Sequence, residues 1–123
     1  MFLDTHAVVF LHAGRFDMFT ETGLELLEEE KLHVSPMVIL ELQYLYEIGR
    51  LRFDARTIRH DLEGSISLRV SAEKWEPITH KAQEMDWTRD PFDRMIAAQA
   101  LVESTRLLTR DRKILRNCSL ALW

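Results

Sequence analysis

The sequence holds little cysteine, proline or glycine. Among its 123 residues are one cysteine, three prolines and four glycines. The single Cys118 excludes an internal disulfide and a cysteine-rich zinc site, and it is typical of a protein from a reducing compartment. No stretch rich in glycine, serine or proline divides the chain. We therefore expect one domain over residues 1–123.

Long apolar runs are also missing. No run approaches the ~20 residues that a membrane-spanning helix needs. The amino-terminal residues do not show the basic stretch, apolar segment and small-residue cleavage site of a signal peptide. We expect a cytoplasmic protein that does not associate with a membrane.

The chain lacks an excess of positive charge. Sixteen Lys and Arg stand against twenty Asp and Glu, for a formal net charge of −4. Taken alone, this balance argues against a non-specific nucleic-acid coat, which usually carries a basic excess. The acids are unevenly placed, because residues 16–30 hold six of them and no base. Outside that segment the chain is slightly basic.

Apolar spacing and capping residues predict short strands that alternate with helices. The strands are expected near residues 2–3, 32–34, 67–70, 106–109 and 119–122. Helices are expected over residues 5–14, 22–31, 37–48, 54–63, 77–85 and 90–103, with a helical turn at 111–116, and Gly64 is expected to end the fourth helix. This alternation predicts an α/β fold with a mainly parallel sheet that helices cover on both faces.

Two acids follow expected strands. Asp4 stands at the end of the first strand, and Asp111 comes just after the fourth. In open parallel sheets, ligands bind beyond the carboxyl ends of the strands, so these side chains are expected at one edge. Each could also serve only as the N-cap of the helix that follows it.

Glu41 is the one charge on an apolar stripe of its helix. The stripe, which should face the core, contains Met37, Tyr44, Leu45 and Ile48. An unpaired buried carboxylate costs several kcal/mol, so Glu41 needs a compensating partner. The residues leave open whether that partner is an arginine or a metal ion.

The segment Asp90-Pro91-Phe92-Asp93 is typical of a helix start, with Asp90 as the N-cap and Pro91 in the first turn. Asp93 shares a helix face with small apolar residues that should pack closely on the sheet, so its side chain is expected to point inward. Four carboxylates then converge on one edge, namely Asp4, Glu41, Asp93 and Asp111. Ligands that are all oxygen favour hard ions such as Mg²⁺ or Mn²⁺.

Several segments together resemble one family. Residues 1–14 (MFLDTHAVVFLHAG), 90–100 (DPFDRMIAAQA) and 107–111 (LLTRD), with the final Trp123, are similar to PIN-domain ribonucleases, particularly VapC-type toxins. Glu41 lies where that family has its helical glutamate. The resemblance covers essentially the whole chain and implies a PIN-like α/β/α sandwich, although the strand before Asp4 is shorter than in many members.

The resemblance implies a metal-dependent endoribonuclease that cleaves structured RNA and leaves 5′-phosphate and 3′-hydroxyl ends. It makes Asp4 and Asp93 the principal ligands of Mg²⁺ or Mn²⁺, with Glu41 and Asp111 completing the cluster. Asp90 becomes an accessory acid, and Thr5 and Thr109 orient the carboxylates through their hydroxyls. It also implies a toxin–antitoxin pair, with a VapB-type antitoxin as partner and a homodimeric toxin.

Arginines crowd the acidic signature. Four of them flank predicted ligands and are candidates for contact with RNA phosphates: Arg89, Arg94, Arg110 and Arg112. For any single one of them, an ordinary solvated surface is a slightly better explanation than contact with RNA. The five histidines are scattered, which argues against a histidine-pair ribonuclease.

A catalytically silent PIN-like module that binds RNA or protein is the alternative function. Such a module would tolerate a degenerate acidic cluster, whereas here all four acidic positions are filled. Assigning those four acids to metal binding leaves equal numbers of acids and bases in the rest of the chain. The negative balance therefore does not exclude an RNA substrate.

Overall fold

Five short strands form one sheet in the computed structural model, which describes residues 1–72 and 74–123. They run in the order β3-β2-β1-β4-β5, and every pairing is parallel. The strands are β1 (Phe2–Leu3), β2 (His33–Val34), β3 (Arg69–Val70), β4 (Leu107–Leu108) and β5 (Ala121–Leu122). The mainly parallel sheet expected from the sequence is confirmed.

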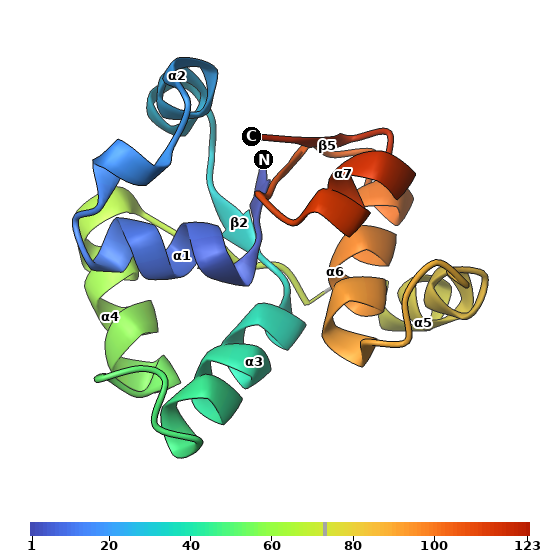
Figure 1. Cartoon of the computed structure of the whole chain (residues 1–123), viewed down its shortest axis with the longest axis horizontal. Coiled ribbons are helices and arrows are strands. Elements are labelled where there is room, and N and C mark those ends of the chain that lie inside the picture. Colours follow the sequence, from blue (N-terminus) through green and yellow to red (C-terminus); the bar gives the residue numbers. More distant parts are fainter. Residues whose placement is uncertain (73) are drawn as a thin grey trace.

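Helices cover both faces of this sheet. They are α1 (Thr5–His12), η1 (Phe16–Met18), α2 (Glu21–Glu29), α3 (Pro36–Glu47), α4 (Ala55–Ile66), α5 (Trp75–Gln83), α6 (Pro91–Val102) and α7 (Arg112–Asn117). In Figure 1, α1 and α4 lie on one side of the sheet and α5 and α6 lie on the other. The α/β/α architecture is thus confirmed. In the part of the chain that the structure describes, no helix is long and apolar enough to cross a membrane.

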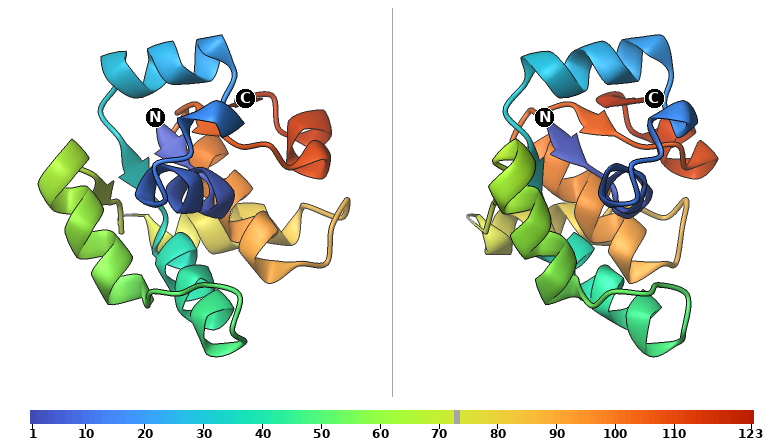
Figure 2. Two further views of the ribbon diagram at one scale, coloured as in Figure 1. Left: turned by 60° about the vertical axis from the view of Figure 1, so that its left-hand side comes forward. Right: turned by 90° about the vertical axis from the view of Figure 1, so that its left-hand side faces the viewer.

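The core is centred on the pair β1 and β4, which lie side by side in Figure 2. Leu3 is in register with Leu108, and both side chains are fully buried. Helix α6 contributes the buried small residues Ala97 and Ala100. Small side chains allow a helix to approach its neighbours closely, and this packing sets the direction in which the first turn of α6 points.

Helix α4 is longer than the sequence pattern predicts. The expected end at Gly64 is wrong, because α4 continues to Ile66 and ends at Ser67, which has a φ of 55°. The amides of Ser67 and Leu68 both donate to the carbonyl of Leu62, and Leu68 is buried. The burial of Leu68 therefore sets where the helix ends.

Gly64 is consequently an interior helix position with room for a side chain. A Cβ built at Gly64 meets no atom within 4 Å, and the residue is not in the left-handed region. Replacing glycine by alanine at such a site reduces the conformational freedom of the unfolded chain. We expect Gly64→Ala to raise the free energy of unfolding by about 0.5–1 kcal/mol, measured by urea denaturation. Gly49→Ala is the contrasting control, because Gly49 has a φ of 78°, which alanine rarely adopts. This variant should have a lower free energy of unfolding than the wild type.

Smaller differences lie at element ends. Helix α5 begins at Trp75 and ends at Gln83, about two residues earlier than expected, and the short helix η1 is not predicted by the sequence pattern. Gly14 has a φ of 65° just after α1, as expected for a residue that follows a helix end. These differences leave the order of the elements unchanged.

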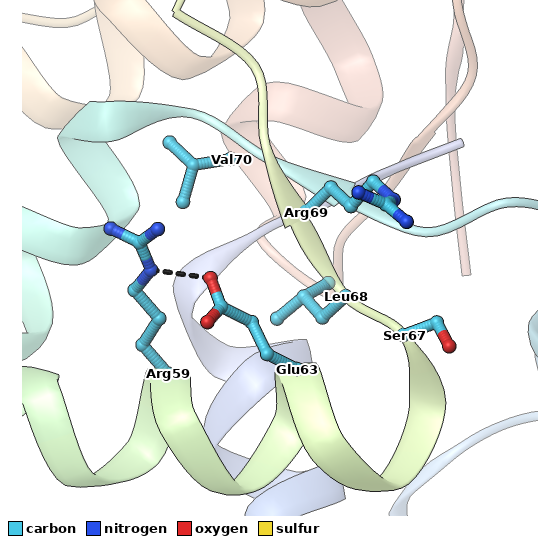
Figure 3. A pocket seen from close by; sticks show the side chains of 6 residues that line it. All are labelled: Arg59, Glu63, Ser67, Leu68, Arg69 and Val70. Carbon is cyan, nitrogen blue, oxygen red and sulfur yellow. Dashed lines mark hydrogen bonds and ion pairs between the residues drawn. The ribbon is translucent and has the colours of Figure 1, made fainter.

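A pocket lies beside the edge strand β3, where Figure 3 shows its lining side chains. Arg59 Nε donates to Glu63 Oε1 over 2.6 Å, so these two charges compensate each other. Strand β2 separates β3 from the central strand β1. The pocket is therefore remote from the acids that the sequence singles out.

Candidate active site

The order of the strands brings two of the predicted acids together. The chain starts at β1, proceeds to β2 and β3 on one side, and returns to β4 on the other side of β1. Asp4 directly follows β1, and Asp111 follows β4 after two residues. Both therefore lie at the carboxyl edge of the sheet, at the point where the strand order reverses. Each is also the N-cap of the next helix.

Thr109 connects these two acids. Its hydroxyl donates to Asp4 Oδ2 over 2.6 Å and accepts from the backbone amide of Asp111 over 3.0 Å. The other carboxylate oxygen of Asp4 accepts from the backbone amide of Thr5 over 2.7 Å. Asp4 and Thr109 are both buried. The Asp4 carboxylate is thus held in one orientation by two donors.

Thr5 makes the corresponding contact with α3, because its hydroxyl donates to Glu41 Oε2. The solvent exposure of the residues on the Glu41 stripe differs from the prediction. The core side of α3 consists of Val38 and Leu42, whereas Tyr44 and Ile48 are each 49% exposed. The expectation that this stripe faces the core is confirmed for Met37, which packs against the core, and is wrong for Tyr44 and Ile48. Helix α3 packs on α1, α4 and α6, and its far end extends beyond the sheet (Figure 1).

The first turn of α6 supplies the remaining acids. Asp90 caps the helix by accepting from the amides of Phe92 and Asp93, over 2.8 and 3.2 Å. Asp93 is half-buried, and three residues further along its face the helix is fully buried at Ile96 and Ala97. Asp93 therefore points inward, as the small-residue face of α6 predicts.

These carboxylates have no basic partner among residues 1–72 and 74–123. No Lys, Arg or His nitrogen of those residues lies within 4.0 Å of a carboxylate oxygen of Asp4, Glu41, Asp90, Asp93 or Asp111. An arginine ion pair, one of the two partners considered for Glu41, is thus not formed. No ion pair within the described residues therefore neutralises the negative charge of the cluster.

The burial of these groups and their mutual repulsion change their proton affinity. Burial raises the pKa of Glu41 to about 7, and the carboxylates of Asp4, Asp90 and Asp93 add to the effect, against the hydrogen bond from Thr5. Burial and the charge of Asp90 likewise raise the pKa of Asp93 to about 7. Burial also raises the pKa of Asp4, although the hydrogen bonds from Thr109 and Thr5 oppose it. A cation placed among these groups would relieve the repulsion.

The raised pKa values predict how the stability of the metal-free protein depends on pH. Asp93 titrates near 3.8 when unfolded and near 7 when folded, so between those values the folded state binds more protons. In EDTA, stability should therefore fall as pH rises from about 4 to about 7 and then level off. Asp93→Asn removes this penalty and should raise the free energy of unfolding at pH 7.5 by about 1–2 kcal/mol, after allowance for solvent screening.

Thermal melting of the wild type and Asp93→Asn at pH 5 and pH 7.5 measures the effect. The difference between the two proteins should be large at pH 7.5 and small at pH 5. Added Mg²⁺ or Mn²⁺ should raise the melting temperature of the wild type more than that of the variant. Equal differences at both pH values would contradict the repulsion described above.

The donor set fits a hard divalent cation. The donors are carboxylate and hydroxyl oxygens, which Mg²⁺ and Mn²⁺ prefer, and no ion pair in the described part of the chain neutralises their charge. Among the residues that the structure describes, no three His, Cys, Asp or Glu side chains already close around one point as metal ligands would. The acids therefore lie near one another at one edge of the sheet, although no three of them surround one point.

The four arginines predicted to contact RNA differ in their exposure and in the contacts that they make. Arg89, Arg110 and Arg112 are exposed, and the guanidinium of Arg110 lies over the ring of Phe10 at 5.4 Å. Arg94 turns away, because its Nε donates to the carbonyl of Thr88 over 2.7 Å and its side chain lines a pocket against α5.

Two further residues lie close enough to affect the acids. The positive charge of Lys113 acts to lower the pKa of Asp93, and that of His6 acts to lower the pKa of Asp4. The sequence offered a signal for both, since Lys113 follows Asp111 by two residues and His6 follows Asp4 by two. Arg106, five residues before Asp111 in the sequence, instead pairs with Glu30 at the start of β4. It therefore lies at the opposite end of that strand from Asp111.

Comparison with known proteins decides the family. The sequence matches the family model of the PIN domain over residues 1–120. The chain is a PIN domain. No curated protein sequence gives a significant match.

Solved structures share the fold of this PIN domain. A toxin–antitoxin complex from Klebsiella pneumoniae includes a chain 14% identical, with a TM-score of 0.66 over 99% of this chain and 95% of that chain. VapBC2 from Rickettsia felis, bound to a DNA fragment from its promoter, includes one 19% identical, with a TM-score of 0.69 over 98% and 96%. FitAcB from Neisseria gonorrhoeae is 19% identical, with a TM-score of 0.56 over 99% and 95%. At these identities the likeness establishes a common fold.

Proposed function

We propose that this PIN domain is a metal-dependent endoribonuclease and the toxin of a type II toxin–antitoxin pair that cleaves structured RNA. One observation carries the proposal: carboxylates from four separate segments gather at the carboxyl edge of the sheet with no basic partner among the described residues. Membership of the PIN family supports nuclease chemistry at that edge.

The chain's own residues have distinct roles in this proposal. Asp4 and Asp93 hold Mg²⁺ or Mn²⁺, while Glu41 and Asp111 complete the cluster. The bound ion supplies an activated water and neutralises charge at the phosphate. Asp90 is an accessory acid at the rim, where its carboxylate caps α6 and adds to the negative potential at Asp93.

Thr5 and Thr109 act through other residues. Thr109 fixes the Asp4 carboxylate, and Thr5 fixes that of Glu41, so both restrict the orientations of ion ligands. Arg89, Arg110 and Arg112 are exposed near the acids and are suited to binding phosphates on either side of the cleaved bond. Arg94, whose Nε is bound to the Thr88 carbonyl, supports the loop before α6 and presents only the rest of its guanidinium for RNA.

The partners in this proposal are a VapB-type antitoxin, a second copy of the chain and the RNA substrate, all in the cytoplasm. The solved neighbours include chains from toxin–antitoxin complexes, which supports an antitoxin. Helix α3 exposes apolar side chains that a protein partner would cover, among them Leu40 at 55% and Tyr44 at 49%.

The test is RNA cleavage by the purified, antitoxin-free protein. Structured RNAs are incubated with Mg²⁺, with Mn²⁺ and with EDTA, and the products are mapped at single-nucleotide resolution. We expect cleavage with either ion, none in EDTA, and products with 5′-phosphate ends. A catalytically silent module that binds RNA or protein is the alternative function. It predicts RNA or partner binding without cleavage under all three conditions.

A further inference from the structure

A row of three side chains runs from the acidic cluster along α1. His6 lies in the first turn of α1, two residues after Asp4, and Phe10 follows one helical turn later, with 6.4 Å between the two rings. Arg110, the neighbour of Asp111, reaches from the loop after β4 and places its guanidinium 5.4 Å from the centre of the Phe10 ring. We name this set the His6–Phe10–Arg110 row.

The row stands on a packed aromatic base. Phe10 meets Phe19 edge-on at 6.1 Å and Trp123 at 6.2 Å, and those two rings stack on each other at 4.8 Å. Phe19 belongs to the core, and Phe10 and Trp123 pack against it. This base holds the ring of Phe10 in place, and the Arg110 guanidinium lies over that ring.

The outer surfaces of the row are free to bind a ligand. His6 and Arg110 are both exposed, and the Arg110 guanidinium lies over the Phe10 ring. Among residues 1–72 and 74–123, no carboxylate pairs with Arg110. The row thus offers flat imidazole and guanidinium surfaces directly beside the acids.

Flat aromatic and guanidinium surfaces bind unpaired nucleobases by stacking, which is the usual way in which proteins hold single-stranded RNA. A contact to phosphate alone would need only a positive charge, whereas this row combines the Arg110 guanidinium with the two aromatic rings of His6 and Phe10. We propose that the His6–Phe10–Arg110 row binds the base of an unpaired nucleotide next to the phosphate that lies at the acids. The proposal rests on the proposed function, because it places RNA at that site.

Binding of two RNAs that differ only in their bases tests the row. The full chain carries Asp93→Asn so that RNA stays intact, and binding is followed by fluorescence anisotropy at two or more salt concentrations. One probe is a labelled oligoadenylate, and the other has the same length with abasic riboses at alternate positions. We expect the oligoadenylate to bind at least about fivefold more tightly, because a stacked base contributes about 1 kcal/mol or more.

Substitutions in the row separate stacking from charge. Arg110→Lys keeps the positive charge but loses the planar group, so it should abolish most of the preference for bases and leave the salt dependence unchanged. His6→Ala should also reduce the preference. Arg56→Lys on α4 is the matched control, because Arg56 is exposed and stands outside the row; it should bind both RNAs as the parent does.

Two results would overturn the proposal that the row binds a base. The first is that Arg110→Lys and His6→Ala still prefer the oligoadenylate as strongly as the parent does. The same result is expected if the row binds a protein partner instead of RNA. The other is equal binding of the two probes, or no binding, by the parent chain. The nuclease proposal is judged separately by cleavage. If the chain cleaves RNA but shows no preference for bases, the nuclease proposal stands and the base-binding proposal fails. If the row binds bases but the chain never cleaves RNA, the base-binding proposal stands and the nuclease proposal fails.

Discussion

Asp93→Asn is expected to abolish RNA cleavage while the protein stays folded. The substitution removes one of the two principal carboxylates proposed to hold the ion, and amide oxygens bind Mg²⁺ and Mn²⁺ far more weakly than carboxylates do. Loss of one group that stabilises developing charge commonly lowers the rate by about 10²–10³-fold, and loss of a metal ligand should cost at least as much. We expect a decrease of at least about a thousandfold, measured as initial cleavage rate with Mn²⁺.

We expect the Asp93→Asn variant to fold, because the Asp93 side chain makes no polar contact that the fold needs in the part of the chain that the structure describes. Asp93 is not the N-cap of α6, and its carboxylate accepts no hydrogen bond among the described residues. The variant should therefore be at least as stable as the wild type without metal. Asp86→Asn is the matched control, because Asp86 is exposed in a turn before α6, and it should cleave normally. Wild-type cleavage by Asp93→Asn would reject the assignment of Asp93 to the metal site.

Leu3→Ala is expected to give the largest loss of stability. Leu3 is fully buried in the central strand and lies in register with Leu108, which is also fully buried. Removing a buried leucine side chain costs the transfer of its methyl groups and leaves a cavity, together about 2–5 kcal/mol. That is a large share of the roughly 5–15 kcal/mol by which a domain of this kind is stable. Denaturant unfolding followed by circular dichroism measures the change.

The same substitution should also impair the site, because Leu3 immediately precedes Asp4. Leu40→Ala provides the comparison, since Leu40 is 55% exposed on α3, and its loss should change stability by no more than about 0.5 kcal/mol. A loss of less than 1 kcal/mol for Leu3→Ala would show that the chain repacks around β1 and that the two-residue strands hold less of the core than their burial indicates.

The sequence predicts the elements of the fold well where local chemistry decides them. Asp4, Asp90 and Asp111 each cap a helix by accepting backbone amides, and the capping pattern is visible in the sequence around each. The parallel pairing of the strands follows from their alternation with helices, whereas their order in the sheet is known only from the structure. Gly64 misleads because a glycine often ends a helix, whereas here the burial of Leu68 carries the chain one turn further.

The sequence predicts the site less completely, because contacts between distant residues determine it. The far part of the Glu41 stripe, at Tyr44 and Ile48, is exposed because α3 extends past the sheet, which periodicity within one helix does not reveal. Arg106 is close to Asp111 in sequence but stands at the other end of β4. The stacking of Arg110 on Phe10 joins residues 100 positions apart and has no local signal.

The hydrogen bond between Thr109 and Asp4 spans 105 residues, and it has a consequence for the timing of activity during protein synthesis. Strand β1 is made before its neighbour β4, and helices α1 to α6 are made between the two. A nascent chain shorter than about Asp111 has neither the donor that fixes Asp4 nor the acid beside it. Translation products that end before Thr109 therefore lack an assembled acidic cluster, and under the proposed function they would not cleave RNA.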